Sequence, residues 1–435
     1  MRSTGQIRWI LALLAATALV ASACSSSGGG SDEGTNGGTG EPVTLDLWVF
    51  KEIESGTFYD QLISEFEAAH PNIDIEMTSY PEDGYGVKVT TAIAAGKEPD
   101  LVLAFGPEDI RSEMLMPIDD VIEEQGIDLS TYSQSIMGEG GEFSCGWEGH
   151  LYCMGSYQGV WGIVYNKAML DAAGIAYPAV WPPMTPDQFV DMACQMTDEA
   201  NGVWGGAAAD PMYFLPWESF VSDDGKTVQG HVNGTETVHA FDVLGQGFKQ
   251  HCLPSLNVLD PSIQGRDFIA EGKLAMAITD LLDLRTVEDA GIDYGVTAPP
   301  TPPGEDPYFF SWSDSLGVMN TTDNPDEAKE FLAFVATDGG RIRFETTGDL
   351  PLDSMVAEQV NWANDIPGRL DILELAKHAR PAIFIPNRWD VLGPLWDAWG
   401  YVTSGEKSAQ TALDDVTPAI QENLDKAWDD WNSQD

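Results

Sequence analysis

The first regular pattern of apolar and polar positions lies between residues 45 and 105. The apolar run Leu45–Phe50 predicts a buried strand, and Thr57 then opens a helix whose apolar residues recur at helical spacing. Ile73–Met77 alternates as a second strand, a helical stretch ends at Gly96, and Leu101–Phe105 is a third strand. This β-α-β-α-β order predicts a parallel sheet with helices on its faces.

The later chain repeats this style. A strand is predicted at Val160–Tyr165 and a helix at Lys167–Ala173, and Thr185 is expected to cap another helix after two prolines. Asn324 is a candidate N-cap, with Pro325 at the first helical position and Glu327 three residues after the cap. The last pattern, from about residue 408 to 431, is an amphipathic helix. Because no linker follows Gly40, two lobes would require a chain that crosses between them more than once.

The first 23 residues read as an export signal. Arg2 and Arg8 precede an apolar stretch from 9 to 20 that is too short to span a bilayer. The small residues before Cys24 resemble the lipobox of bacterial lipoproteins, in which the cysteine is diacylated, although Ala21 stands where leucine is preferred. Ordinary cleavage is the alternative. Residues 24–41, rich in Gly and Ser, predict a flexible tether to the extracellular face of the cytoplasmic membrane.

Chain length and net charge limit the number of lobes and the classes of ligand that the sequence allows. About 390 residues after the tether exceed what one hydrophobic core usually organises, so two lobes are expected. With 70 acidic and 21 basic residues, the net charge is −49. Such a charge repels nucleic acid and anionic lipid and argues against an anionic substrate.

Four cysteines follow Cys24, and an even number in an exported chain suggests disulfides. Cys145 and Cys153 flank Gly146–His150, a sequence that predicts a β-turn, so they can face each other on a hairpin. This pairing leaves Cys194 with Cys252. Free buried thiols are the alternative, and no histidine stands at metal-ligand spacing, so we expect no metal site.

Five segments together resemble a known family. They are the helix-to-strand corner at 66–73, the "A-x-A-x-G-x-x-P-D" pattern at 93–102, the "Y-N-K" segment at 164–170, the following "A-G-I" with prolines before a threonine, and "F-x-x-G-K-x-A-M" at 268–276. In this order they are similar to the extracellular solute-binding proteins of ABC importers, family 1, in the carbohydrate-binding branch.

The resemblance implies an α/β, periplasmic-binding-protein-like fold of type II, in which hinge strands join two α/β lobes with the ligand cleft between them. The first lobe would comprise residues 42–157 and 313–352, and the second 158–312 and 353–435. It also implies a monomer that delivers its solute to the permease subunits of an ABC transporter, with no cofactor and no catalysis.

Sugars stack their C–H faces on aromatic rings and give their hydroxyls to planar polar groups, and open α/β sheets bind ligands at the carboxyl ends of strands. Candidate ligand-binding residues therefore follow the strands. They are Phe50, Glu52, Phe105, Tyr157, Gln158, Trp161, Asp280, Trp312, Asp314, Arg388 and Trp389.

Some of these candidates have simpler interpretations. Glu52 could be a solvated loop charge, Trp161 could be core, and Arg388 with Trp389 could form a surface cation–π pair. Leu282 stands where the family often carries a tryptophan, which puts a stacking platform there in doubt.

The sequence thus favours a non-enzymatic receptor for a mono- or oligosaccharide. A secreted glycoside-active enzyme is the first alternative, since chance carboxylate pairs abound, although no catalytic motif stands out. The second alternative keeps the fold and binds a polyamine or another cationic solute, which the negative charge would favour.

Overall fold

The computed structural model describes residues 42–433, with gaps at 51–52, 82–83, 105, 140, 209, 212–214, 216–218, 257, 259–264, 283, 304–306 and 308. Of the sequence predictions, the export signal, Cys24 and the tether lie outside the described residues, as do Glu52 and Phe105.

The first sheet begins with the predicted parallel unit. Strand β1 (Val43–Phe50) lies between β2 (Ile73–Tyr80) and β3 (Leu101–Ala104), and both pairs are parallel. Helices α1 (Ile53–Ala69) and α2 (Tyr85–Ala95) connect them, so the predicted β-α-β-α-β order is confirmed. The predicted start of α1 at Thr57 is wrong by about one turn, because the backbone is already helical from Ile53.

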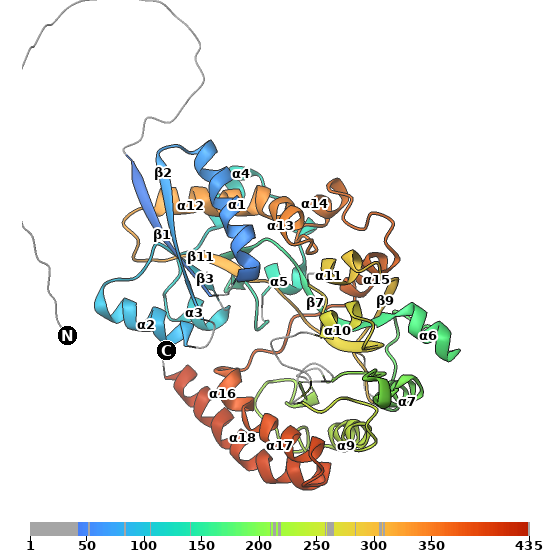
Figure 1. Ribbon diagram of the computed structural model, residues 1–435. Helices are drawn as coiled ribbons and strands as arrows, with labels where there is room; N and C mark the ends of the chain where they lie inside the picture. The colour runs from blue at the N-terminus through green and yellow to red at the C-terminus, as the bar shows by residue number, and fades with distance from the viewer. Residues whose placement is uncertain are drawn as a thin grey trace, which may run out of the picture. The chain divides into compact units, whose positions relative to one another are not determined.

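Two strands from later in the chain complete this sheet. The order is β2-β1-β3-β11-β6, in which β11 (Ser315–Val318) runs antiparallel to both β3 and β6 (Cys153–Gly155). Figure 1 shows α1, α4 (Asp119–Gln125), α12 (Pro325–Phe334) and α13 (Gly340–Thr346) gathered around this sheet. The chain therefore returns to the first lobe after building part of the second, as the absence of a linker predicted.

The second sheet is built around one long strand. Strand β7 (Gly159–Asn166) pairs antiparallel with β8 (Met276–Asp280), β9 (Tyr294–Thr297) and β10 (Ser311–Trp312). The helices of this lobe include α6 (Lys167–Ala173), α7 (Pro186–Met196), α9 (Thr235–Lys249), α17 (Pro394–Thr403) and α18 (Ala409–Asn432).

Shorter elements connect these parts and carry several of the residues discussed below. They are α3 (Pro107–Arg111), η1 (Leu129–Thr131), α5 (Gln134–Met137), β4 (Gly146–Trp147), β5 (His150–Leu151), η2 (Glu199–Asn201), α10 (Gly265–Ala270), α11 (Arg285–Asp289), a π-helical turn (Val335–Gly339), α14 (Ser354–Gln359), α15 (Pro367–Ala376) and α16 (Arg388–Leu392).

Helix capping follows the sequence at one of the two predicted positions, and a further cap is found at Ser408. Thr185 forms a full capping box with Gln188 at the start of α7, and Ser408 accepts a hydrogen bond from the backbone of Thr411 at the start of α18. Asn324 does occupy the N-cap of α12, but its side chain makes no capping bond. Its ψ of 54° departs from the extended geometry that lets a cap side chain reach the N2 and N3 amides.

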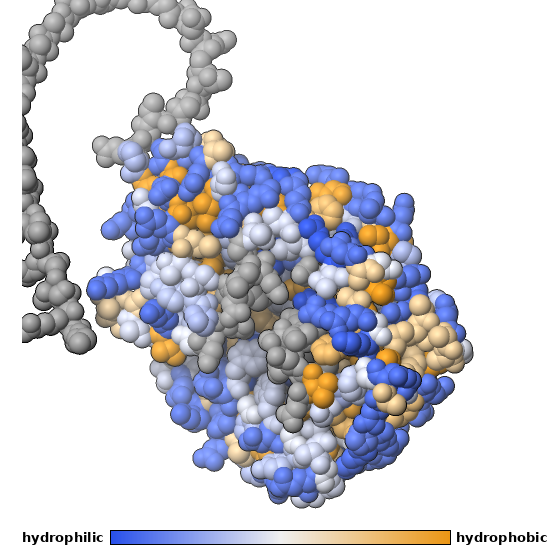
Figure 2. All heavy atoms as spheres, in the orientation of Figure 1, coloured by the Kyte–Doolittle hydropathy of each residue, from blue (hydrophilic) through white to orange (hydrophobic). Residues whose placement is uncertain are grey.

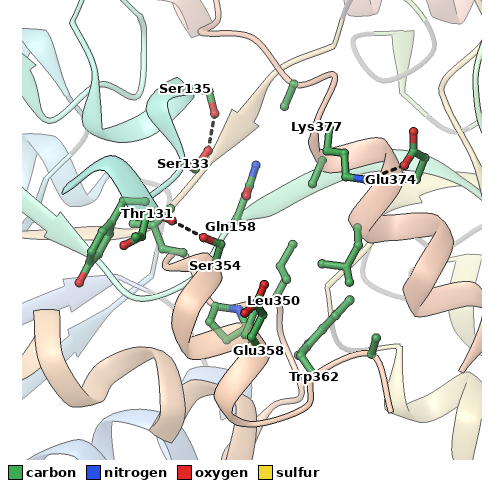
Figure 3. Close-up of a pocket in the computed structure, with 18 of the residues that line it drawn as sticks. Thr131, Ser133, Ser135, Gln158, Leu350, Ser354, Glu358, Trp362, Glu374 and Lys377 are labelled. Atoms are coloured by element: carbon green, nitrogen blue, oxygen red, sulfur yellow. Dashed lines mark hydrogen bonds and ion pairs between the residues drawn. The ribbon is translucent and has the colours of Figure 1, made fainter. Parts of the chain in front are cut away.

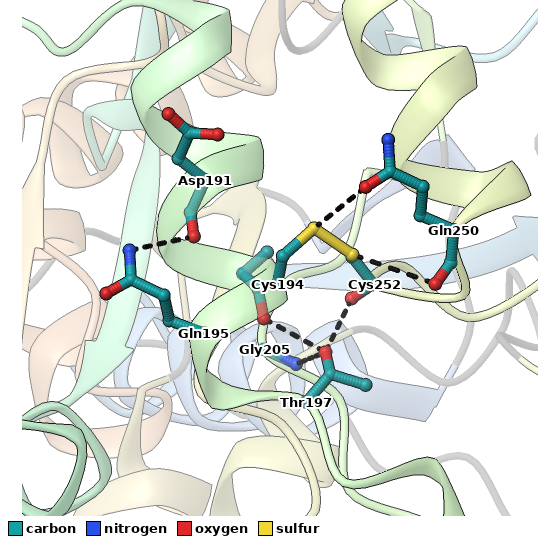
Figure 4. Close-up of a disulfide and its surroundings, with 8 residues drawn as sticks. Asp191, Cys194, Gln195, Thr197, Gly205, Gln250 and Cys252 are labelled. Atoms are coloured by element: carbon teal, nitrogen blue, oxygen red, sulfur yellow. Dashed lines mark hydrogen bonds between the residues drawn. A yellow bond between two sulfur atoms is a disulfide. The ribbon is translucent and has the colours of Figure 1, made fainter.

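Both expected disulfides are present. Cys145 and Cys153 flank the β4–β5 hairpin, whose turn residues Glu148 and Gly149 both have positive φ (51° and 82°), as a type I′ turn requires. The second disulfide joins Cys194 in α7 to Cys252 just after α9, beside Gln250 and Thr197 (Figure 4). It joins α7 to the segment that follows α9, and the two cysteines are 58 residues apart in sequence.

Two lobes thus form around separate cores. One cluster fills the first lobe between its sheet and α1, α12 and α13, whereas the other two clusters cover the faces of β7 and its neighbours. On the face shown in Figure 2, hydrophilic residues dominate and apolar ones are scattered, in keeping with the acidic composition. Among the described residues, no helix combines the length and apolarity that a membrane span requires.

Candidate functional site

Three chain segments cross between the two sheets and form the hinge. Ser156–Gln158 leads from β6 into β7, and Ser313–Asp314 leads from β10 into β11. The third segment, Leu350–Leu352, runs beside the first, since the backbone of Gln158 donates to Leu350 and that of Leu352 donates to Ser156. The hinge is therefore a hydrogen-bonded ribbon whose two faces carry different side chains.

One face of this ribbon carries stacked indoles. Trp161 and Trp312 lie with ring centroids 4.8 Å apart and planes at 26°, and Phe310 lies 6.4 Å and 6.2 Å from them. A Cβ on Gly159 would sit 2.4 Å from the Trp312 ring, so only glycine admits the indole there. The structure thus brings together two predicted site residues that are 151 positions apart in sequence.

Asp280 ends β8 directly opposite Trp161 in the β7–β8 register. Its Oδ1 accepts from Arg266 at 2.8 Å and from the backbone of Leu282 at 3.1 Å, and both charged side chains are largely buried. The predicted carboxylate is therefore at the strand end beside the indoles. Arg266, which sequence reasoning missed, fixes its orientation.

Tyr157 and Asp314 also lie together, on two adjacent hinge segments. The Tyr157 ring is buried, with the guanidinium of Arg343 4.4 Å from its centroid, and Arg343 pairs with Asp349 at 2.7 Å. Burial first, and then the negative charge of Asp314, raise the pKa of Tyr157 well above its usual range. Tyr157 is therefore neutral, and its buried ring packs within the hinge. Its contact with a ligand stays a prediction.

Phe50 ends β1 as expected, but its ring is only 4% exposed and packs 5.4 Å from the ring of Tyr85 in the first core. This position gives Phe50 a packing role. A direct contact between Phe50 and a ligand remains a prediction that no contact in the structure supports.

Arg388 and Trp389 differ sharply in exposure although they are neighbours at the start of α16. Trp389 is 52% exposed and lies 6.2 Å from the Trp396 ring, whose Nε1 donates to Asp210. Arg388 is buried, pairs with Glu142 and lies over the Trp389 ring at 4.6 Å. The cation–π contact of the alternative interpretation is thus present, although Arg388 is buried and not at the surface. Trp389 has the surface that a sugar ring could cover.

Gln158 lies on the opposite face of the hinge ribbon from the indoles, because successive strand residues alternate in direction. Its amide donates to Ser311, and its side chain lines a cavity of about 930 Å³ (Figure 3). The other walls come from η1, α5, α14 and α15, including Ser133, Ser354 and Trp362. Of the predicted site residues that the structure describes, Gln158 alone lines this cavity.

The cavity and the indoles therefore mark two sites. Among the described residues, those at the carboxyl ends of β1, β3 and β8 do not line the cavity, whereas Asp280 and the Trp161–Trp312 stack lie at or beside such an end. Since ligands of open α/β sheets bind at these ends, the indole face of the hinge is the candidate ligand cleft.

Two lobes, a hinge of three crossing segments and a cleft at the strand ends define a binding protein of the type II periplasmic-binding-protein-like fold. Solved structures share it. A substrate-binding protein of an ABC transporter from Listeria monocytogenes, in complex with cycloalternan, aligns with a TM-score of 0.74 and 20% identity over 88% of this chain and 99% of that one. The GacH receptor of Streptomyces glaucescens aligns with a TM-score of 0.72 and 21% identity over the same shares.

Sequence comparison supplies the family. Residues 51–342 match the model of the bacterial extracellular solute-binding proteins, and the chain belongs to that family. The melibiose/raffinose/stachyose-binding protein MelE of Bacillus subtilis is 24% identical over 372 residues, or 81% of this chain and 83% of that protein. The maltotriose-binding protein of Pyrococcus abyssi is 25% identical over 314 residues, or 69% of this chain and 63% of that protein.

Proposed function

We propose that this chain is the substrate-binding lipoprotein of an ABC importer, and that it captures a carbohydrate between its lobes and delivers it to the permease. The observation that carries the carbohydrate assignment is the Trp161–Trp312 stack beside Asp280 at the end of β8. Aromatic faces next to a carboxylate suit a neutral polyhydroxylated ring. The sugars in the names of its relatives support the same class of ligand.

The proposed activity has no chemical step. The lobes would sample open and closed arrangements about the hinge, and a ligand that touches both lobes would favour closure. The proposed lobes are residues 42–157 with 313–352, and residues 158–312 with 353–435. Each backbone crossing named above lies at or next to one of these boundaries, which supports the division.

Attachment to the membrane is proposed through lipid on Cys24 alone, with residues 25–40 as the tether, and the receptor is proposed to act as a monomer. The support is the sequence of residues 1–24 together with the family. A streptococcal relative, 25% identical over 156 residues, is named a maltooligosaccharide ABC transporter solute-binding lipoprotein.

The test is a thermal-shift panel on the purified chain with maltotriose, raffinose and stachyose, read beside spermidine, amino acids and a nitrophenyl glycoside. A rise in melting temperature with a sugar and none with spermidine is expected. A rise with spermidine alone would assign a cationic solute, and release of nitrophenol would assign an enzyme. Either result overturns the proposal.

A further inference from the structure

A buried carboxylate of the proposed first lobe contacts the segment that carries Trp389. Glu142 lies in the loop between α5 and β4, within the proposed first lobe, and its side chain is 9% exposed. Its Oε1 pairs with Nη1 of Arg388, and its Oε2 accepts from the backbone N–H of Ile385 at 3.1 Å. One side chain therefore holds both ends of a four-residue segment of the proposed second lobe.

The loop that carries Glu142 is firmly attached to the first lobe. Cys145 is joined to Cys153 of β6, and the Ser144 hydroxyl accepts from the backbone of Gly141. Gly106, just after β3, has φ of 106°, and a Cβ there would lie 2.4 Å from the Glu142 carbonyl oxygen. Glycine at position 106 thus lets the loop approach the end of β3.

A second carboxylate acts on the same segment. Glu108 of α3 accepts from the backbone N–H of Asn387, a residue in the left-handed region (φ 52°) that starts α16. The backbone of Glu142 also donates to Ala382 at 2.9 Å. The segment 382–388 is therefore held by the first lobe at four points, and the exposed ring of Trp389 follows directly.

We propose that Glu142 is a positioning residue, which fixes the Ile385–Arg388 segment across the two lobes so that Trp389 is presented to the ligand and the closed arrangement persists. The inference rests on the proposed function and goes beyond it by naming a residue with no ligand contact of its own. On this proposal, both side chains return to water when the lobes part. The pair therefore forms and breaks with closure.

Because Glu142 is proposed to hold the closed arrangement, it should slow the dissociation of the sugar and leave its association unaffected. We expect Glu142→Ala to leave the association rate of maltotriose or raffinose nearly unchanged and to raise the dissociation rate about tenfold or more, because it removes the carboxylate that pairs with the buried Arg388 and holds the Ile385 amide. Glu142→Gln keeps one acceptor oxygen and should fall between Glu142→Ala and the unchanged chain. Glu148→Gln, in the exposed hairpin turn of the same region, is the matched control.

A double-mutant cycle of Glu142 and Trp389 distinguishes a positioning role of Glu142 from a contribution to folding stability alone. Trp389→Ala should cost far less affinity in the Glu142→Ala background than in the unchanged chain, since the ring is then already misplaced. A purely structural Glu142 would lower the melting temperature but leave the dissociation rate of the folded fraction unchanged, and the two substitutions would add. That outcome overturns the proposal.

The positioning role of Glu142 can be tested even if the sugar assignment is wrong. If the unchanged chain binds none of the sugars, the proposed function fails, and Glu142 is tested without ligand. Spin labels at Val87→Cys and Asp429→Cys, two exposed positions on α2 and α18 in a Cys24→Ser chain, report the distance between the lobes. Glu142→Ala should shift the distribution to longer distances, and identical distributions would refute the positioning role.

Discussion

The indoles of Trp161 and Trp312 stack across the β7–β10 pair with centroids 4.8 Å apart, and Gly159 leaves the space that this stack needs. Trp161 lies in β7 just after the first crossing segment, and Trp312 ends β10 just before the second. A ligand that covers both rings would therefore touch the part of the molecule about which the lobes move.

We expect Trp312→Ala to weaken sugar binding by about tenfold or more, because the ring supplies a stacking face at the cleft. Trp312→Phe retains a flat ring and should lose clearly less. Isothermal titration with maltotriose and raffinose measures both. Trp181→Ala, whose ring stacks on His378 at 4.2 Å, controls for the loss of a tryptophan as such. Equal losses for Trp312→Ala and Trp181→Ala would speak against a specific role for Trp312.

Trp389→Ala should likewise weaken binding by about tenfold or more, because half of this indole is exposed. Leu370→Ala is the informative comparison. Leu370 is a similarly exposed apolar residue (50%), but it lines the cavity on the other face of the hinge. If Leu370→Ala weakened binding and Trp389→Ala did not, the sugar would bind in the cavity and the assignment of the cleft would be wrong.

The sequence predicted those parts of the fold that depend on local patterns, in which a residue type has a single physical role. The parallel unit β1 to β3 followed from apolar periodicity, and Thr185 followed from the pairing of a cap hydroxyl with Gln188. The disulfides followed from an even number of cysteines and a turn of the right length. Trp161 and Trp312 were named as separate candidates, but their stack was not foreseen.

The site was less predictable from the sequence, because the burial of a site residue and its ion-pair partners depend on segments that are distant in the chain. Phe50 follows a strand as the rule for strand ends requires, yet its ring points into the core. Glu142 was not a candidate, because one acid among 70 in a loop carries no pattern. Its partner Arg388 lies 246 positions away in sequence, and only the folded chain brings the two together.

The two disulfides should differ in their contribution to stability. In the chain-entropy picture, the Cys194–Cys252 link, which spans 58 residues, contributes about 4 kcal/mol, and the Cys145–Cys153 link, which spans 8, contributes about 2.5 kcal/mol. Urea unfolding of the two paired Cys→Ala variants measures the difference. A larger loss for the shorter link would show that its hold on the Glu142 loop outweighs loop entropy.

Stability should depend on pH through Glu142. Burial raises the pKa of Glu142 from 4.5 to about 7, while Arg388 and the Ile385 amide offset part of this effect, and nearby Glu108 adds to it. Burial also raises the pKa of Glu108, which faces Arg388 and Asp390. Because the folded pKa exceeds that of the unfolded chain, the stabilisation is complete below pH 4.5 and is lost as the pH rises through about 7.

The measurement is the free energy of unfolding in urea between pH 5 and pH 8, for the unchanged chain and for Glu142→Gln. The amide does not titrate, so the stability of the chain relative to the variant should fall across this window by up to roughly 3 kcal/mol. Glu374→Gln is the control, because the ion pair with Lys377 lowers the pKa of Glu374, and its contribution is constant above pH 5. A constant difference between the unchanged chain and Glu142→Gln would mean that Glu142 stays ionised in the fold, with its charge balanced by Arg388.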